Sequence, residues 1–104
     1  MATGTIPTTN AIYVSASSAT AEQIKKATVA IAYYKTSDNI TMSTVALIPE
    51  QSTKGLSAVW NGQRWFYSFV SIWWSKANGT ISLKDSYTER PNATVSLVGY
   101  FLIF

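Results

Sequence analysis

The 104-residue sequence contains no histidine and no cysteine, and only five of its side chains are acidic. Without histidine the chain lacks the usual general base, the usual triad partner and the commonest metal ligand. Without cysteine it can form no disulfide, no thiolate nucleophile and no cysteine-based metal site. So few titratable groups favour a protein that binds or assembles. We therefore expect no enzymatic activity, no catalytic residue, no metal site and no cofactor.

The few carboxylates are spread along the chain, as Glu22, Asp38, Glu50, Asp85 and Glu89. A glycosidase needs two carboxyl groups about 5 to 9 Å apart. Asp85 and Glu89 lie four residues apart on a predicted strand, about 13 Å at ~3.3 Å per residue, which is too far. Other pairings depend on the fold. Asp85 falls among apolar residues in its strand, so we expect it at a sheet rim or paired with a Lys or Arg.

Charge of either sign is also scarce. Charged residues make up 12% of the chain and the net charge is +3, with Lys25-Lys26 as the only adjacent cations. A nucleic-acid partner would call for a clustered basic stripe, so none is expected. The longest apolar run, residues 98–104, is too short for a membrane-spanning helix, so we expect no membrane insertion. Ser and Thr fill about a quarter of the positions, which favours a virion or extracellular location.

The pattern of apolar and turn residues predicts one all-β domain over residues 11–104, preceded by a flexible lead at 1–10. We expect an antiparallel, jelly-roll-like β-sandwich of six to eight strands with at most one short helix. That helix would follow an N-cap at Ser18. Asn61-Gly62 and Asn78-Gly79 predict type I′ hairpin turns. The predicted strands are 11–15, 28–34, 40–48, 56–60, 64–76, 80–88 and 93–104.

Two predicted strands, 64–76 and 93–104, carry apolar residues on both faces. Antiparallel sheets usually have one solvent-exposed, polar face, so an apolar residue set on that second face has to be buried by other groups. A homo-oligomer would supply it, with a trimer favoured; the alternative is a monomer covered by its loops or by residues 17–27. Strict alternation divides each strand into two faces. In strand 64–76, one face carries Trp65, Tyr67, Phe69 and Trp73, and the other carries Phe66, Val70, Ile72 and Trp74. In strand 93–104, one face carries Val95, Leu97, Phe101 and Ile103, and the other carries Val98, Tyr100, Leu102 and Phe104. The residues predicted at a subunit interface are Trp73, Trp74, Tyr100, Leu102 and Phe104.

The tryptophans allow two interpretations. An exposed Trp can stack on the apolar face of a sugar ring, whereas a Trp in mid-strand is usually core. Trp60 and Trp65 flank the Asn61-Gly62 turn and are predicted to form a cross-strand pair at the surface. Gln63 and Arg64 beside them could donate hydrogen bonds to ligand hydroxyls. The predicted ligand-binding residues are therefore Trp60, Gln63, Arg64 and Trp65.

The chain resembles small β-sandwich tip modules of bacteriophage tail fibres and related virion appendages. The features behind the resemblance are the Thr/Ser-rich lead at 1–10, the Asn78-Gly79 hairpin after WWSKA, and a last strand, TVSLVGYFLIF, that ends the chain. The resemblance implies a trimeric, non-enzymatic module that contacts host surface glycans or proteins, or joins parts of a particle. No binding residue carries over from it.

Three functions remain open on this basis. The first is a virion structural or receptor-binding module, and the second is a free-standing, lectin-type carbohydrate-binding domain. The third is a particle decoration or coat subunit that binds no ligand.

Overall fold

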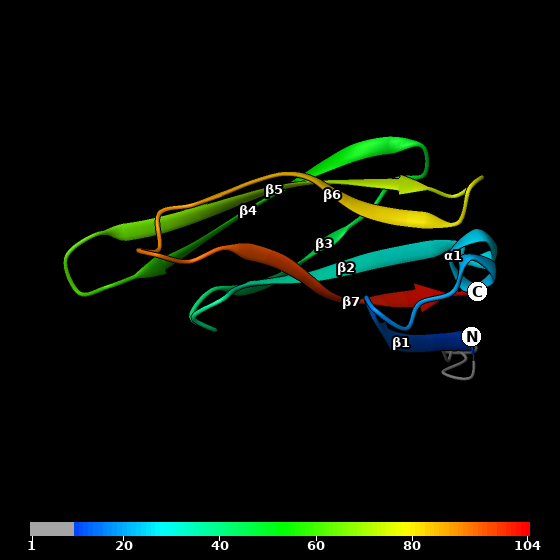
Figure 1. Cartoon of the computed structure of the whole chain (residues 1–104), viewed down its shortest axis with the longest axis horizontal. Coiled ribbons are helices and arrows are strands. Elements are labelled where there is room, and N and C mark those ends of the chain that lie inside the picture. Colours follow the sequence, from blue (N-terminus) through cyan, green and yellow to red (C-terminus); the bar gives the residue numbers. More distant parts are fainter. Residues whose placement is uncertain (1–9) are drawn as a thin grey trace, which may run out of the picture.

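The computed structural model describes residues 10–104, which form two antiparallel sheets packed face to face (Figure 1). Sheet A has four strands and sheet B has three, so the predicted antiparallel sandwich of six to eight strands is confirmed. The predicted lead falls outside the described residues except for Asn10. In spatial order, sheet A contains β1 (Ala11–Ser15), β7 (Val95–Ile103), β2 (Val29–Thr36) and β3 (Met42–Ala46), and sheet B contains β4 (Gln51–Trp60), β5 (Trp65–Ser75) and β6 (Thr80–Thr88).

The core lies between the two inner faces. The small side chains of Ala30 and Ala32 on β2 belong to the same buried cluster as the bulky Trp74 of β5. Alternating small and large residues across facing sheets let the layers interdigitate. The buried hydrophobic residues are Ile24, Ala27, Ala30, Ala32, Tyr34, Leu47, Val70, Ile72, Trp74, Tyr100 and Leu102.

Three residues predicted at a subunit interface belong to this core. Trp74 and Leu102 are 0% exposed and Tyr100 is 4% exposed. Their prediction as interface residues is wrong, because the two sheets of one chain already cover the inner faces. Trp73 and Phe104 lie outside the core, and Phe104 is exposed. For these two residues an interface role stays a prediction.

A bulge in β7 breaks the alternation assumed from the sequence. Tyr33 pairs with Gly99 but Tyr34 pairs with Leu97, so Val98 is an extra residue. An extra residue shifts every later side chain to the opposite face. Val95 and Leu97 therefore pack against the core together with Tyr100 and Leu102, and the predicted grouping of this strand is wrong. A Cβ at position 99 would collide with the Tyr13 ring, which requires glycine there.

A second bulge in β6 explains the position of Asp85. Ser71 pairs with Asp85 and Ile72 with Leu83, which leaves Lys84 unpaired. The shift keeps Leu83 on the inner side and sends Asp85 and Tyr87 to the outer face of sheet B. Strict alternation was wrong in placing Asp85 on the face of Ile81 and Leu83, because the bulge separates them. Asp85 lies exposed on the edge strand β6, which agrees with its expected place at a sheet rim.

The turns and one strand also differ from expectation. Trp60 pairs with Trp65 across a four-residue loop in which only Gly62 has a positive φ, of 99°. A type I′ turn needs two such residues, so this turn type is wrong here and at Gly79. The Asn61 side chain holds the loop by accepting hydrogen bonds from two backbone N–H groups. β4 begins at Gln51, within the predicted loop, because an edge strand of Ser, Thr and Lys shows little apolar alternation.

The expected short helix is α1 (Ala21–Lys26), and its N-cap is Thr20 rather than Ser18. The Thr20 hydroxyl accepts from the Gln23 N–H at 3.2 Å, while the Gln23 side chain accepts from the Thr20 N–H at 3.0 Å. This reciprocal capping box decides where the helix begins. Ile24 is its buried residue and belongs to the core cluster. Within residues 10–104, no helix is long and apolar enough to cross a membrane.

An ion pair ties the two sheets together at one end. Arg90, after β6, donates from Nε to Asp38 in the β2–β3 turn at 2.9 Å. Asp38 also accepts from the Thr36 hydroxyl and from the Ile40 N–H. These hydrogen bonds, led by that of Thr36, lower the pKa of Asp38 from 3.8 to about 2.

We expect the Asp38 contribution to disappear in acid. Because its folded-state pKa is lowered, the ionised carboxylate stabilises the fold above pH 3.8, and this stabilisation is lost as pH falls towards about 2. Asp38→Asn should therefore lower the melting temperature near neutral pH and leave it unchanged near pH 2. Thermal melts from pH 2 to 7 test this. Glu22→Gln, in a fully solvated helix pair, is the control and should show no such pH-dependent difference.

The assignment of Leu102 to the core gives a second expectation. Leu102→Ala should lower the free energy of unfolding by about 2 to 5 kcal/mol, because it leaves a cavity between the sheets. Phe104→Ala, two residues away and exposed, should change it by less than about 1 kcal/mol. Urea unfolding followed by tryptophan fluorescence measures both. Similar losses for the two variants would contradict the core assignment.

Candidate binding surface

The outer face of sheet B carries a run of exposed aromatic side chains, which we call the aromatic stripe: Trp60, Trp65, Tyr67 and Tyr87, with Leu56 beside them. Their exposed fractions range from 43% for Tyr67 to 70% for Leu56. Trp60 lies opposite Trp65, and the half-buried Phe69 lies opposite both Leu56 and Tyr87, so these side chains form one continuous patch. Monomeric soluble proteins rarely leave such patches uncovered unless they bind something.

Two cross-strand aromatic pairs make up most of the stripe. The ring centroids of Trp60 and Trp65 are 5.6 Å apart with an interplanar angle of 59°. Those of Tyr67 and Tyr87 are 5.7 Å apart at 49°. The rings are tilted, so the two rings of a pair cannot both lie flat on one planar ligand.

The hairpin between β4 and β5 places the tryptophans at an extremity of the molecule. It projects beyond sheet A at one end of the long axis (Figure 1). On the inner side of this projection the ring of Phe66 is flanked by two guanidinium groups instead of by sheet A. Arg64 lies 4.3 Å and Arg90 5.4 Å from its ring centroid. These cation–π contacts cover the inner side of the tip and leave the tryptophans as its apolar outer side.

The predicted ligand-binding residues are only partly brought together. Trp60 and Trp65 form the expected exposed pair, and Gln63 is exposed in the loop between them. Arg64 does not join them. Its guanidinium lies over Phe66 and 3.5 Å from the carboxylate of Glu89, which also accepts from the Tyr67 N–H.

Sequence reasoning missed two members of the stripe. Tyr67 shares the predicted face of Trp65, so the alternation of β5 could have identified it. Tyr87 could not be identified in this way, because strict alternation places it on the face of Ile81 and Leu83. Only the bulge at Lys84 turns it outward.

The outer face of sheet A is a second apolar surface. Tyr13 and Phe101 pair across β1 and β7 with ring centroids 4.7 Å apart. The Tyr33 hydroxyl lies 3.2 Å from the Met42 sulfur, and Lys35 is the one charged residue on this face among the described strands. Both outer faces thus carry large exposed apolar side chains, whereas an ordinary antiparallel sandwich keeps its outer faces polar.

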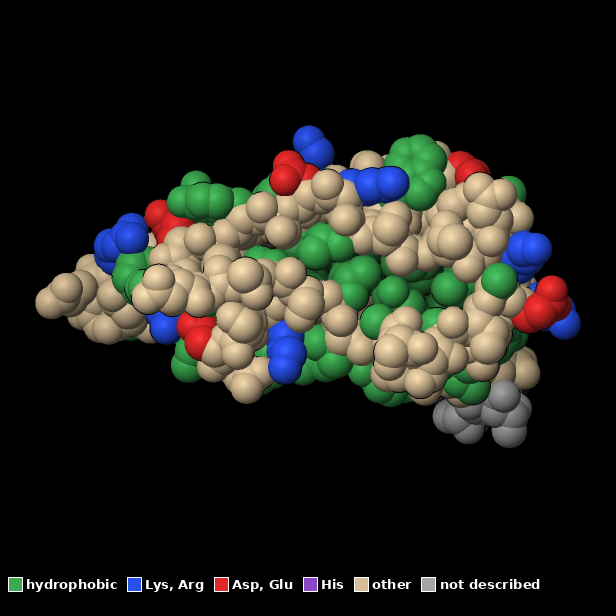
Figure 2. Space-filling model, viewed as in Figure 1, with side chains coloured by type: hydrophobic (Ala, Val, Ile, Leu, Met, Phe, Trp, Pro, Cys, Tyr) green, Lys and Arg blue, Asp and Glu red, His purple; other side chains and the backbone are tan. Residues whose placement is uncertain are grey.

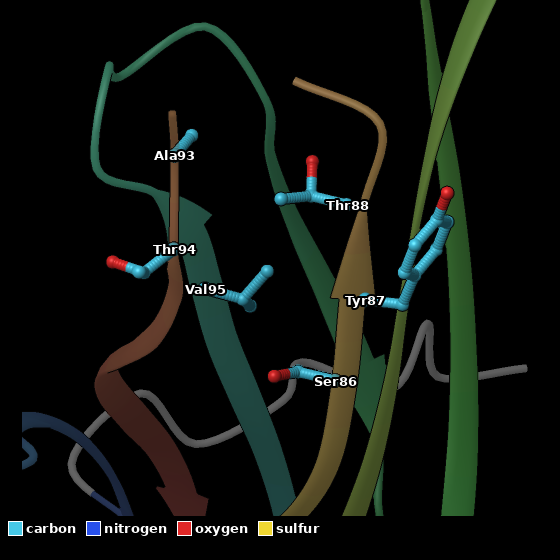
Figure 3. A pocket seen from close by; sticks show the side chains of 6 residues that line it. All are labelled: Ser86, Tyr87, Thr88, Ala93, Thr94 and Val95. Atoms are coloured by element: carbon cyan, nitrogen blue, oxygen red, sulfur yellow. The ribbon is translucent and has the colours of Figure 1, made fainter. Parts of the chain in front are cut away.

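A seam between β6 and β7 exposes part of the core edge. Figure 2 shows apolar side chains between the rims of the two sheets. Near one end the seam holds a cavity of about 330 Å³ (Figure 3). Ser86 and Thr88 point towards β7 there, while the Tyr87 ring points away. The lining residues are Ser86, Tyr87, Thr88, Ala93, Thr94 and Val95.

This cavity offers little chemistry. Tyr87 is its only titratable residue, and its other polar side chains are hydroxyls. Across residues 10–104, no three His, Cys, Asp or Glu side chains come together as metal ligands. The stripe, rather than the cavity, is therefore the candidate functional surface.

The exposed tryptophan pair should tolerate truncation. Trp60→Ala removes an aromatic pair at the surface and should lower the free energy of unfolding by about 0.5 to 1.5 kcal/mol. Trp74→Ala, the buried counterpart, should cost about 3 to 5 kcal/mol. Urea unfolding monitored by circular dichroism compares the two. If Trp60→Ala unfolded the protein, Trp60 would have to be reassigned to the core.

Comparisons with protein-family models, with curated proteins and with solved structures returned no match for this chain.

Proposed function

We propose that the chain is a non-enzymatic structural or receptor-binding module of a virion or extracellular appendage. It assembles as an oligomer and contacts a host surface or a partner protein through the aromatic stripe. The observation that carries the proposal is the exposure of Trp60, Trp65, Tyr67 and Tyr87 on one continuous face. The virion location rests on the resemblance to fibre tips, which by itself also implies three copies.

The physical argument rests on the kind of side chain exposed. Trp and Tyr are enriched among the residues that dominate binding energy, because they supply a large apolar area and lose little conformational entropy. Their charged neighbours are few, so a partner would displace water from rings rather than from ionic groups. The position at the tip of a projecting hairpin leaves the pair free to meet a large partner.

A lectin-type carbohydrate-binding domain is the second candidate. The observation favouring it is the 59° tilt of the Trp60–Trp65 pair, with Gln63 exposed in the intervening loop. One ring can stack on a pyranose while the other closes the side, and the amide can donate to or accept from hydroxyls. This function needs neither an oligomer nor a virion.

A glycan array probed with the native protein and two variants tests the stripe. Trp65→Ala should weaken binding of any recognised glycan about 30-fold, the loss expected for a hot-spot residue of about 2 kcal/mol. Tyr13→Ala removes an exposed ring from the opposite face and is the matched control, which should bind normally. Binding that survives Trp65→Ala would remove the stripe as the site. A monomer in light scattering that binds glycans would favour the lectin over the appendage module.

A further inference from the structure

Strand β4 forms one edge of sheet B and leaves backbone groups open. In the described part of the chain its backbone pairs with β5 alone, in an unbroken register from Gln51–Trp74 to Trp60–Trp65. Asn61 donates to the Arg64 carbonyl at 3.1 Å, which continues the same ladder. Hydrogen-bonded pairs alternate along an antiparallel ladder, so the odd-numbered residues of β4 bond to β5. The residues whose N–H and C=O groups point away from β5 are Ser52, Lys54, Leu56, Ala58 and Trp60.

The other sheet edges are protected and this one is not. β1 and β3 have five residues each, and β6 is interrupted by its bulge at Lys84 beside Asp85. Short strands, bulges and charges are the usual devices that prevent edge pairing. β4 has ten residues, no bulge, no proline and a single charge at Lys54. A long, regular and nearly uncharged edge is a template for another strand.

We propose that β4 pairs with β4 of a second copy, antiparallel, about a twofold axis that passes between the two Leu56 residues. The two copies then share one six-stranded sheet. This register sets Leu56 opposite Leu56 of the second copy, Lys54 opposite its Ala58, and Ser52 opposite its Trp60. It is the one twofold register in which all five outward residues find a hydrogen-bonding partner.

Side chains on the edge agree with this register. Leu56 is 70% exposed, the highest value among the large apolar residues of the described chain, and the axis would bury it against its own copy. The two Lys54 ammonium groups do not meet. Their positions are offset by four residues, about 13 Å along the strands and beyond the Debye length of about 8 Å. The strand is therefore self-complementary, which selects a second copy rather than an unrelated peptide.

The β4–β4 pairing specifies the oligomer that the proposed function includes, and the inference rests on that proposed oligomerisation. An isologous contact closes at two copies, so the elementary assembly is a dimer instead of the trimer that the resemblance implies. Trp60 and Trp60 of the second copy are then offset by eight residues, about 26 Å on the same face of the shared sheet. Two stripes on one face would bind a multivalent surface with avidity.

A cysteine on the axis tests the register directly, because the chain has no cysteine of its own. Hydrogen-bonded antiparallel partners have Cα atoms about 5.5 Å apart, within the disulfide range of about 4.4 to 6.8 Å. Leu56→Cys should form a covalent dimer in oxidised glutathione, seen on a non-reducing gel. Ala58→Cys lies on the same face of the same strand, but its two sulfurs would be about 13 Å apart, so it should form at least tenfold less dimer. Equal cross-linking of both variants, or none of Leu56→Cys, would overturn the proposal.

Native mass by size exclusion with light scattering provides the second readout. The wild-type chain should be a dimer, and a monomer or trimer would overturn the inference. Ala58→Pro removes an outward N–H while keeping the ladder to β5, and should weaken the dimer at least tenfold; Ala58→Val keeps the N–H and should not. If the proline variant does not fold, Leu56→Lys and Leu56→Gln replace it: the two lysines would face each other across the axis and weaken the dimer more than the uncharged glutamines do. Glycan binding is scored separately, so failure of the dimer and failure of the stripe are distinguishable.

Discussion

Strand β5 is the element on which the other features depend. It lies at the centre of sheet B, pairs on both sides, and is apolar on both faces. Because side chains alternate strictly along a strand, Val70, Ile72 and Trp74 pack into the core while Trp65 and Tyr67 point outward. A strand of this kind cannot bury both faces in a two-layer sandwich. The exposed stripe is thus a direct consequence of placing this strand in a three-stranded sheet with no third layer.

The same constraint explains how large apolar side chains come to lie on the outer faces. Sheets A and B cover each other and leave two outer faces, which a chain with so few charges fills with aromatic, aliphatic and hydroxyl groups. Exposing apolar side chains to water is unfavourable, and this free-energy cost disappears only if another molecule covers the face. The proposed assembly and recognition rest on an uncovered apolar face, a regular edge strand at β4 and a projecting hairpin.

The local alternation pattern predicted much of the architecture. It failed where one extra residue shifts the side chains that follow it to the other face of the sheet. The alternation of β5 was correct on both faces because its register is continuous with β4. In β7 and β6 a single unpaired residue, Val98 or Lys84, shifts the following side chains to the other face. A bulge forms where it improves packing against a strand that is distant in sequence, so no local pattern reveals it. Consequently Val95 and Leu97 were assigned to the wrong face, and Tyr87 was missed at the surface.

By itself the sequence determined the β class, the strand count to within one, the helix segment and the pairing of Trp60 with Trp65. These follow from period-two alternation, turn residues and capping groups, all of which act over a few residues. The tertiary structure decided which apolar face forms the core and buried Trp74, Tyr100 and Leu102 within the chain. It also directed Arg64 towards Phe66 and Glu89. It also decided that β4 is an edge. Those outcomes depend on which distant strands become neighbours, because burial and edge position are properties of the assembled sheets rather than of any segment.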